Sequence, residues 1–192
     1  MTRTRFAQRA SAAILMLAIS LAAVSVVAQD KPEKDSSSTP RILRHHDGTA
    51  EGRKSLGGSG EMIRFEGVKE SAKITALRIH GSRYGTPQPP NEDFTIYFLD
   101  AEMNVIATRA APYRLFERGE QRWVQVKINE PVQVPGTFWV VLDFHAHQTK
   151  GVYVSYDTST GGKFSKTGLP GEEVRDTNFA GDWMVEAVVG RP

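Results

Sequence analysis

Three potential metal ligands stand close together in the stretch DFHAHQTKG, residues 143–151: Asp143, His145 and His147. On a β-strand, side chains two residues apart point to the same side, so these three could present a carboxylate and two imidazoles along one edge. A catalytic zinc site normally uses three protein ligands and keeps a fourth position open. His80, near the end of the apolar segment ITALRIHG, is a further candidate. The pattern leaves open a metal-dependent hydrolase that uses His145 and His147, with Asp143 or His80 as the third ligand.

The alternative interpretation of the same stretch is a turn. If AHQTK is the loop of a β-hairpin, His147 lies inside the turn, where the alternation of side chains along a strand no longer holds. The chain contains no cysteine, which excludes thiolate ligands, thiolate catalysis and disulfide bonds. Because no third ligand is fixed nearby in the sequence, we expect no bound metal ion and no cofactor.

The first 28 residues have the three parts of a secretory signal peptide. Three arginines precede an apolar run over residues 12–27, and Ala28 is followed by the polar pair Gln29 and Asp30. The run is shorter than the roughly 20 apolar residues that cross a bilayer. We therefore expect cleavage after Ala28 and a secreted or periplasmic protein, with cell-surface association open and no transmembrane segment after cleavage.

Removal of that segment changes the charge balance of the chain. It contains three of the 24 basic residues and none of the 22 acidic ones, which leaves 21 basic residues against 22 acidic residues. The remaining lysines and arginines form no cluster of the kind that follows a phosphate backbone. We therefore expect no nucleic-acid partner.

Composition divides the rest of the chain into a tether and one domain. Residues 29–40, QDKPEKDSSSTP, are polar and have no apolar periodicity, which is typical of a flexible linker. Residues 41–60 are rich in glycine, and we expect them to lie along the domain as a lead-in segment. The domain, residues 41–192, is long enough to bury a core of its own.

Short alternating segments separated by turn residues follow residue 60, a pattern typical of an all-β domain. The breaks carry glycine, proline and asparagine, as in GTPQPPN over residues 85–91. At most one helical turn is expected, near YRLFERG. The pattern predicts about eight strands in one antiparallel β-sandwich, at residues 61–66, 73–80, 93–99, 104–109, 122–129, 137–145, 151–157 and 182–189.

Alternation also assigns a buried face to each strand. In TFWVVLDFH, residues 137–145, every second residue from Phe138 to Phe144 is large and apolar and is predicted to lie in the core. The same parity gives the core positions of four other strands. The predicted core set is Phe138, Val140, Leu142, Phe144, Val152, Val154, Tyr156, Phe94, Ile96, Phe98, Val124, Val126, Ile128, Leu77 and Ile79.

The opposite face of two of these strands carries aromatic and carboxylate side chains. If residues 137–145 and 151–157 form a hairpin, Asp143 lies beside Tyr153, and Trp139 lies beside Asp157. Flat aromatic rings stack on sugars or peptide side chains, and carboxylates accept directional hydrogen bonds. The predicted ligand-binding residues are therefore Trp139, Tyr153, Asp143 and Asp157. The alternative is that a loop covers this face and that Trp139 packs in a minor core.

The order of these segments resembles a known group of domains. The runs GGSGEMIRFEG, ITALRIHGSRYG, EDFTIYFLD, VPGTFWVVLDF, GVYVSYD and GDWMV are together similar to the jelly-roll β-sandwich accessory modules of secreted bacterial proteins. Such modules are usually noncatalytic, and the resemblance carries over no catalytic residue. It implies a jelly-roll-like fold and a noncatalytic binding or surface-associated module whose ligand is a carbohydrate or a protein. Two alternatives stay open: the metal-dependent hydrolase and a purely structural envelope protein.

Overall fold

The computed structural model describes residues 40–190 of the chain. The predicted signal peptide, residues 1–28, and the predicted tether up to residue 39 lie outside the described residues. Within residues 40–190, no helix has both the length and the apolar character needed to cross a membrane. The described chain is built of β-strands and one 3-10 turn, η1 (Tyr113–Leu115), at the place where the sequence predicts a helical turn.

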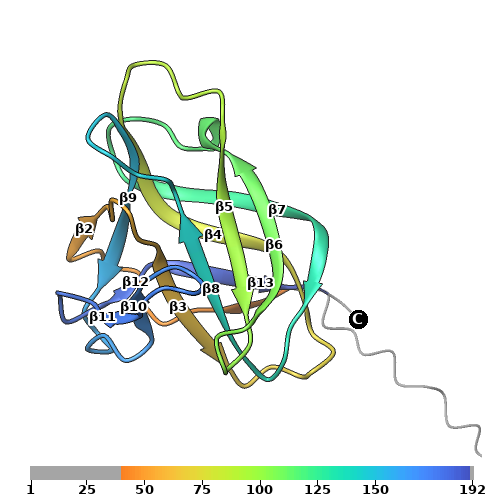
Figure 1. Ribbon diagram of the computed structural model, residues 1–192. Helices are drawn as coiled ribbons and strands as arrows, with labels where there is room; N and C mark the ends of the chain where they lie inside the picture. The colour runs from red at the N-terminus through yellow and green to blue at the C-terminus, as the bar shows by residue number, and fades with distance from the viewer. Residues whose placement is uncertain (1–39, 191–192) are drawn as a thin grey trace, which may run out of the picture. The chain divides into compact units, whose positions relative to one another are not determined.

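The strands form two antiparallel sheets; in Figure 1, β8, β5 and β6 of one sheet lie in front of β4 and β7 of the other. The first, the β4 sheet, has the order β1-β13-β4-β9-β12, with β2 paired to β9 and β7 paired to β4. Its strands are β1 (Arg41–Leu43), β2 (Gly52–Lys54), β4 (Lys73–Gly85), β7 (Arg122–Gln133), β9 (Lys150–Asp157), β12 (Asp182–Trp183) and β13 (Val185–Val189). The second, the β8 sheet, has the order β11-β10-β3-β8-β5-β6. Its strands are β3 (Glu61–Glu66), β5 (Asp93–Leu99), β6 (Val105–Pro112), β8 (Thr137–Asp143), β10 (Ser165–Thr167) and β11 (Arg175–Asp176).

The main strands are paired in a nested order: β2 with β9, β3 with β8, β4 with β7, and β5 with β6. The first strand of this set pairs with the last, the second with the last but one, and so on inward, as in a long hairpin rolled up on itself. One sheet therefore holds the order β2-β9-β4-β7 and the other the order β3-β8-β5-β6. This is the jelly-roll arrangement of a β-sandwich, and the predicted fold class is confirmed.

The core fills the space between the two sheets. The side chains that alternation assigns to the core of β4, β5, β7, β8 and β9 belong to one buried cluster, except for Tyr156, which is half-buried and packs against it. Phe65, Tyr113, Phe116 and Trp183 add further fully buried aromatic rings to this cluster. The predicted inward faces of these strands are therefore confirmed.

A second buried cluster covers the outer face of the β8 sheet. It includes Trp139 and Val141 of β8, and Leu169 and Val174 from the segment between β10 and β11 pack against it. Trp139 is only 5% exposed. A loop therefore covers this face, and Trp139 is a packing residue.

The predicted hairpin between β8 and β9 is wrong. β8 pairs with β3 and β5, whereas β9 pairs with β2, β4 and β12 in the other sheet. The chain changes direction at Asp143, whose Oδ1 accepts the backbone N–H of His145 at 2.8 Å, and His145 adopts a left-handed conformation with φ 46°. Phe144 stays in the core while the chain crosses from one sheet to the other.

Several strand limits also differ from the predicted ones. β4 continues to Gly85 and β7 to Gln133, and the last predicted strand is divided at Met184 into β12 and β13. The short strands β1, β2, β10 and β11 are absent from the prediction. Two or three residues are too few for alternation to be recognised in the sequence.

One carboxyl group lies in the interior at the start of β3. Glu61 is 2% exposed, and neither carboxylate oxygen has a well-aligned hydrogen-bond partner among the described residues. Burial raises the pKa of Glu61 well above its usual range, and the nearby backbone N–H groups of Glu61 and Leu56 offset only part of that effect. The folded protein therefore keeps this group neutral to a higher pH than the unfolded chain does.

Leu142→Ala should lower the free energy of unfolding by about 2–5 kcal/mol, because the change removes buried methyl groups and leaves a cavity between the sheets. Leu142 is 0% exposed and faces the core from β8. Urea unfolding measures the loss. The control is Val105→Ala on the edge strand β6, where the side chain is 47% exposed and the expected change is within about 0.5 kcal/mol. A similarly small loss for Leu142→Ala would show that the assigned face of β8 is wrong.

Glu61→Gln should remove part of the pH dependence of stability. Because the folded-state pKa of Glu61 is raised, its contribution to stability is fully present below the ordinary value of 4.5 and is lost as the pH rises through the folded-state pKa. The wild-type protein should therefore lose stability relative to the variant as the pH rises from about 4.5 towards neutrality. Urea unfolding of both proteins across this range checks the prediction. A constant difference at every pH would contradict it.

Candidate ligand-binding face

The structure does not bring together the four residues of the alternative metal site. His145 Nε2 lies 3.3 Å from Asp143 Oδ2, so these two residues are in contact. His147 lies just before the turn into β9, where its Nδ1 accepts a backbone N–H two residues ahead. His80 belongs to the other sheet, and its Nδ1 lies 2.9 Å from Ser155 Oγ. Residues 40–190 contain no group of three or more His, Cys, Asp or Glu side chains placed to hold a metal ion.

The four predicted ligand-binding residues do not form one surface. Trp139 and Asp143 belong to β8, where they are 5% and 8% exposed. Tyr153 and Asp157 belong to β9 in the other sheet, where Asp157 is fully buried and Tyr153 is half-buried. The interpretation that joined them depends on the β8–β9 hairpin, which the structure does not have. Only Tyr153 presents a substantial part of its side chain to solvent.

Asp157 instead ties the glycine-rich lead-in segment to the β4 sheet. Its Oδ2 accepts the backbone N–H of Asp47 at 3.0 Å, and its Oδ1 accepts the backbone N–H of Ser159 at 2.7 Å. Burial raises the pKa of Asp157, but these hydrogen bonds outweigh the effect of burial and leave the pKa below its ordinary value. The carboxylate is therefore occupied within the protein and has a structural role.

The outer face of the β4 sheet carries a row of aromatic and polar side chains. Every second residue of β4 from position 78 to 84 points away from the core, because the residues between them face inward. Trp123 of β7 and Tyr153 of β9 point to the same side, since the next residue after each of them, Val124 and Val154, faces the core. The register places His80 opposite Trp123 and Ser82 opposite Tyr153. Five side chains on this face form the outer strip: Arg53, Arg78, Tyr84, Trp123 and Tyr153.

At one end of the outer strip, two tyrosines and an arginine are packed together. The ring centroids of Tyr84 and Tyr153 lie 4.7 Å apart. The guanidinium of Arg53, from β2, lies 5.1 Å from the centroid of Tyr153, and its Nη1 donates to Gln121 Oε1 at 3.1 Å. Gln121 in turn donates to Ser82 Oγ at 2.7 Å. These contacts fix the guanidinium of Arg53 over the sheet.

At the other end, Trp123 is packed among imidazole and charged side chains. The guanidinium of Arg78 lies 5.0 Å from its ring centroid, and the rings of His46 and His80 each lie 5.1 Å away. Arg78 Nη1 donates to Glu186 Oε2 at 2.5 Å. Because Trp123 is half-buried, these contacts set the position of the indole while part of it remains exposed.

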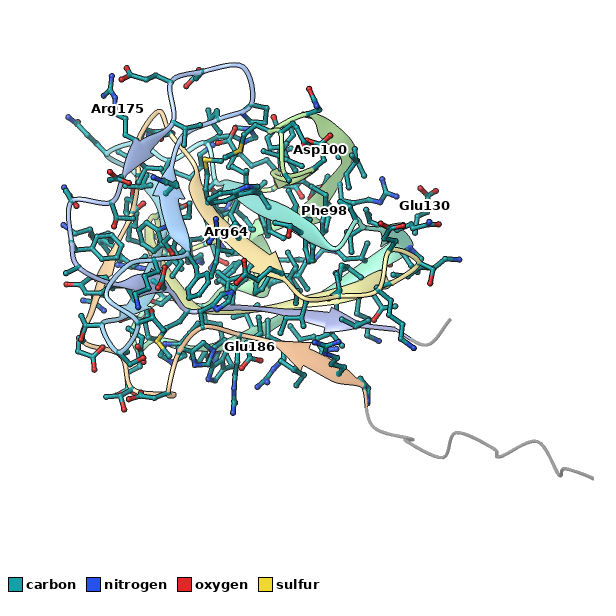
Figure 2. All side chains as sticks on the ribbon, turned by 90° about the horizontal axis from the view of Figure 1, so that it is seen from below. Arg64, Phe98, Asp100, Glu130, Arg175 and Glu186 are labelled. Atoms are coloured by element: carbon teal, nitrogen blue, oxygen red, sulfur yellow. The ribbon has the colours of Figure 1, made fainter. Side chains whose placement is uncertain are left out.

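His46 is a buried imidazole beside Trp123. Its side chain is 2% exposed, and its ring nitrogens have no well-aligned hydrogen-bond partner among the described residues, although Nε2 lies 3.3 Å from Glu186 Oε1. Burial lowers the pKa of His46, and Glu186 offsets part of that effect. Burial also lowers the pKa of His80, so both imidazoles are neutral at pH 7. In Figure 2, Glu186 lies on the side of β13 that faces away from the core residue Phe98.

Of the outer strip, Tyr153 is the member predicted from the sequence to bind a ligand. Tyr84 was missed because the predicted strand ends at residue 80, and Arg53 was missed because β2 is only three residues long. Trp123 was not among the predicted ligand-binding residues. The continued alternation of RIHGSRYG, residues 78–85, is the signal that could have extended β4 and revealed Tyr84.

A shallow cleft of about 270 Å³ lies elsewhere, between the β4–β5 loop and the residues around η1. Its lining residues are Pro89, Pro90, Asn91, Glu92, Asp93, Pro112 and Arg114. Lys150 Nζ donates to Glu92 Oε2 at 2.9 Å, so one of the two acidic groups is already paired. The lining has no histidine, serine or aromatic side chain that could act on a substrate or stack on one.

The comparisons with known proteins give a similar fold. No family model matches the chain, and the search of curated proteins finds no match. The chain is similar to the crystal structure of the cysteine protease and lectin-like domains of Cwp84, a surface layer associated protein of Clostridium difficile, with a TM-score of 0.51 and 11% sequence identity. The similarity covers 80% of this chain and 36% of that one, so the chain spans about a third of the length of its structural neighbour. The likeness shows a shared fold.

The melting temperature should not respond to added zinc or to a chelator, either in the wild-type protein or after replacement of both His145 and His147 by alanine. His145 and Asp143 contact each other, but no third ligand stands beside them within residues 40–190, so the described chain has no preorganised cage for the ion. Thermal unfolding with zinc and with EDTA, together with elemental analysis, checks this. About one zinc per chain that is lost in the double variant would instead favour the metal-dependent hydrolase.

Proposed function

We propose that this protein is a noncatalytic carbohydrate-binding module that binds its ligand on the outer face of the β4 sheet. The observation that carries the proposal is the outer strip, in which Tyr84, Tyr153 and Trp123 are half-buried aromatic side chains on one sheet face. Tyrosine and tryptophan offer a large contact area and lose few torsional degrees of freedom on binding. The apolar faces of sugar rings fit such side chains.

Hydrogen-bonding groups beside the rings would orient the bound sugar. Gln125 is exposed on the same face of β7 as Trp123, two residues along the strand. Gln121 lies at the tyrosine end, where it bonds Arg53 and Ser82. Amide groups both donate and accept, as sugar hydroxyls do. Because contacts within the protein already hold Gln121 in place, less ordering entropy is lost when a ligand binds.

Two buried acidic groups near the outer strip support a noncatalytic role. Asp157 and Glu186 are 0% and 2% exposed, and each is bonded to other groups of the protein. Glycoside hydrolysis normally needs two carboxyl groups that face the scissile bond. Ser155, which contacts His80, is fully buried and is therefore closed to a substrate.

A location outside the cytoplasm is part of the proposal. The predicted signal peptide, residues 1–28, supports export. The structural neighbour Cwp84 is a surface layer associated protein, and the chain matches 36% of the structure of its cysteine protease and lectin-like domains. We place the module in the periplasm, at the cell surface or outside the cell.

Trp123→Ala and Tyr153→Ala should each weaken glycan binding by about 30-fold, which corresponds to a loss of about 2 kcal/mol for an aromatic residue that contributes strongly to an interface. A glycan array identifies the ligand, and isothermal titration calorimetry measures the affinities. Tyr97→Ala is the matched control, because Tyr97 is a half-buried tyrosine on the outer face of the β8 sheet.

The Tyr97→Ala protein should bind like the wild type. Unchanged binding by a folded Trp123→Ala protein would place the site elsewhere. Failure of the wild-type protein to bind any glycan would contradict the proposal and favour the other ligand class predicted from the sequence, a protein.

A further inference from the structure

We infer that the ligand of the outer strip is an acidic oligosaccharide, one that carries carboxylate or sulfate groups, rather than a neutral one. The inference rests on the proposed carbohydrate-binding function and names its ligand class. Three cationic side chains, Arg53, Arg78 and Lys127, lie on the outer side of the β4 sheet. Asp157 and Glu186 are buried and bonded within the protein, and the exposed carboxylate close to Arg53, Glu51, accepts the backbone N–H of Thr158. The cations therefore outnumber the exposed carboxylate, and the accessible charge of the face is positive.

Arg53 and Lys127 are the exposed cations of this face that have no carboxylate partner, a state shared by some exposed cations elsewhere on the described chain, such as Lys69 and Arg118. Arg122, Lys166 and Arg175 each form an ion pair with a nearby carboxylate. Arg53 and Lys127 are both exposed and form no ion pair with a residue in the range 40–190. An exposed ion pair adds little to stability, so the fold loses little when these two cations have no partner within the protein. Their positive charges are available to a ligand.

Arg53 is held in a geometry that suits an anion. Its guanidinium lies over Tyr153, and one nitrogen is bonded to Gln121, which leaves other N–H groups of the planar fork available. A guanidinium presents parallel N–H donors that match the two oxygens of a carboxylate or sulfate. The contact with the ring and the hydrogen bond to Gln121 restrict the guanidinium before the ligand arrives, so binding loses less side-chain entropy. Arg53 therefore offers an anion a positive charge, directional N–H donors and a side chain that is already held in position.

The spacing of the cations indicates an oligomer. Arg53 lies over Tyr153, which is opposite Ser82 of β4, and Lys127 is opposite Ala76. Six residues of β4 separate these two positions, which is about 20 Å along the strand. Arg78 lies between them, with its charge shared with Glu186. A single sugar is too short to reach both ends, so a chain with more than one negative group fits the face.

The test compares three galactose-based oligosaccharides of equal length: an oligogalacturonide with carboxylates, a sulfated galacto-oligosaccharide and an uncharged galacto-oligosaccharide. Calorimetry should show that at least one acidic ligand binds at least about 10-fold more tightly than the uncharged one, because hydrogen bonds to charged groups are the stronger ones. The affinity of that ligand should fall as the salt concentration rises. The two acidic ligands show which anionic group is preferred.

Arg53→Gln should reduce the preference for the acidic ligand over the uncharged one by about 10-fold, and Lys127→Gln should reduce it in the same direction. Arg175→Gln is the control, because Arg175 is an exposed arginine on β11 of the other sheet. It should leave the preference unchanged. Two cation variants keep the test valid if one of them does not fold.

Equal binding of the three oligosaccharides, with a loss of binding in Trp123→Ala, would leave the carbohydrate-binding proposal intact and overturn the inference of an acidic ligand. Binding of an acidic polyglutamate peptide without binding of any oligosaccharide would overturn both. An unchanged preference in folded Arg53→Gln and Lys127→Gln proteins would also overturn the inference, because the positive charge of the face would then have no part in recognition.

Discussion

The nested pairing of strands is the constraint on which the candidate face depends. β9 lies between β2 and β4, and β4 in turn pairs with β7, so segments far apart in the sequence meet on one sheet. The inward residues of these strands are buried in a single core, and strand geometry then forces their neighbours outward. Arg53 contacts Tyr153, and His80 contacts Trp123, only because their strands are neighbours in this order. The face is therefore a consequence of how the core is buried.

Local pattern was sufficient for the fold class and for the inward faces. Alternation along a strand depends only on the chain itself, so Leu142 and Val154 could be assigned to the core without knowledge of the partner strands. Pairing is different, because it depends on long-range burial. The sequence interpretation joined β8 to β9 because they are consecutive, whereas Asp143 bonds the backbone of His145 and sends the chain to the other sheet. The signal for that crossing is a single aspartate, which also fits an ordinary hairpin turn.

The candidate site could be predicted only in part for the same reason. Tyr153 was found because its strand alternates clearly, but its true neighbours, Tyr84 and Arg53, come from other strands. Trp139, like Tyr153, alternates with core residues along its strand and therefore points away from the core. The sequence alone could not show that a loop covers the face of Trp139 and leaves that of Tyr153 open. The segment between β10 and β11, through Leu169 and Val174, makes that difference. Whether a sheet face is covered or open depends on where the long loops lie. Loop sequences have little of the alternation that makes strands predictable.

The outer strip is also held in place by an ion pair between the half-buried Arg78 and the buried Glu186. A buried carboxylate is costly unless it is paired, and Glu186 pairs with Arg78, whose guanidinium lies over Trp123. His46 beside them is neutral because burial lowers its pKa, so it fills space next to the indole without adding a second buried charge. If His46 were charged at pH 7, Glu186 would be shared between two cations and the hold on Arg78 would weaken. Neutral His46 therefore keeps Arg78 committed to Glu186, which keeps Trp123 in one position and leaves the accessible positive charge to Arg53 and Lys127.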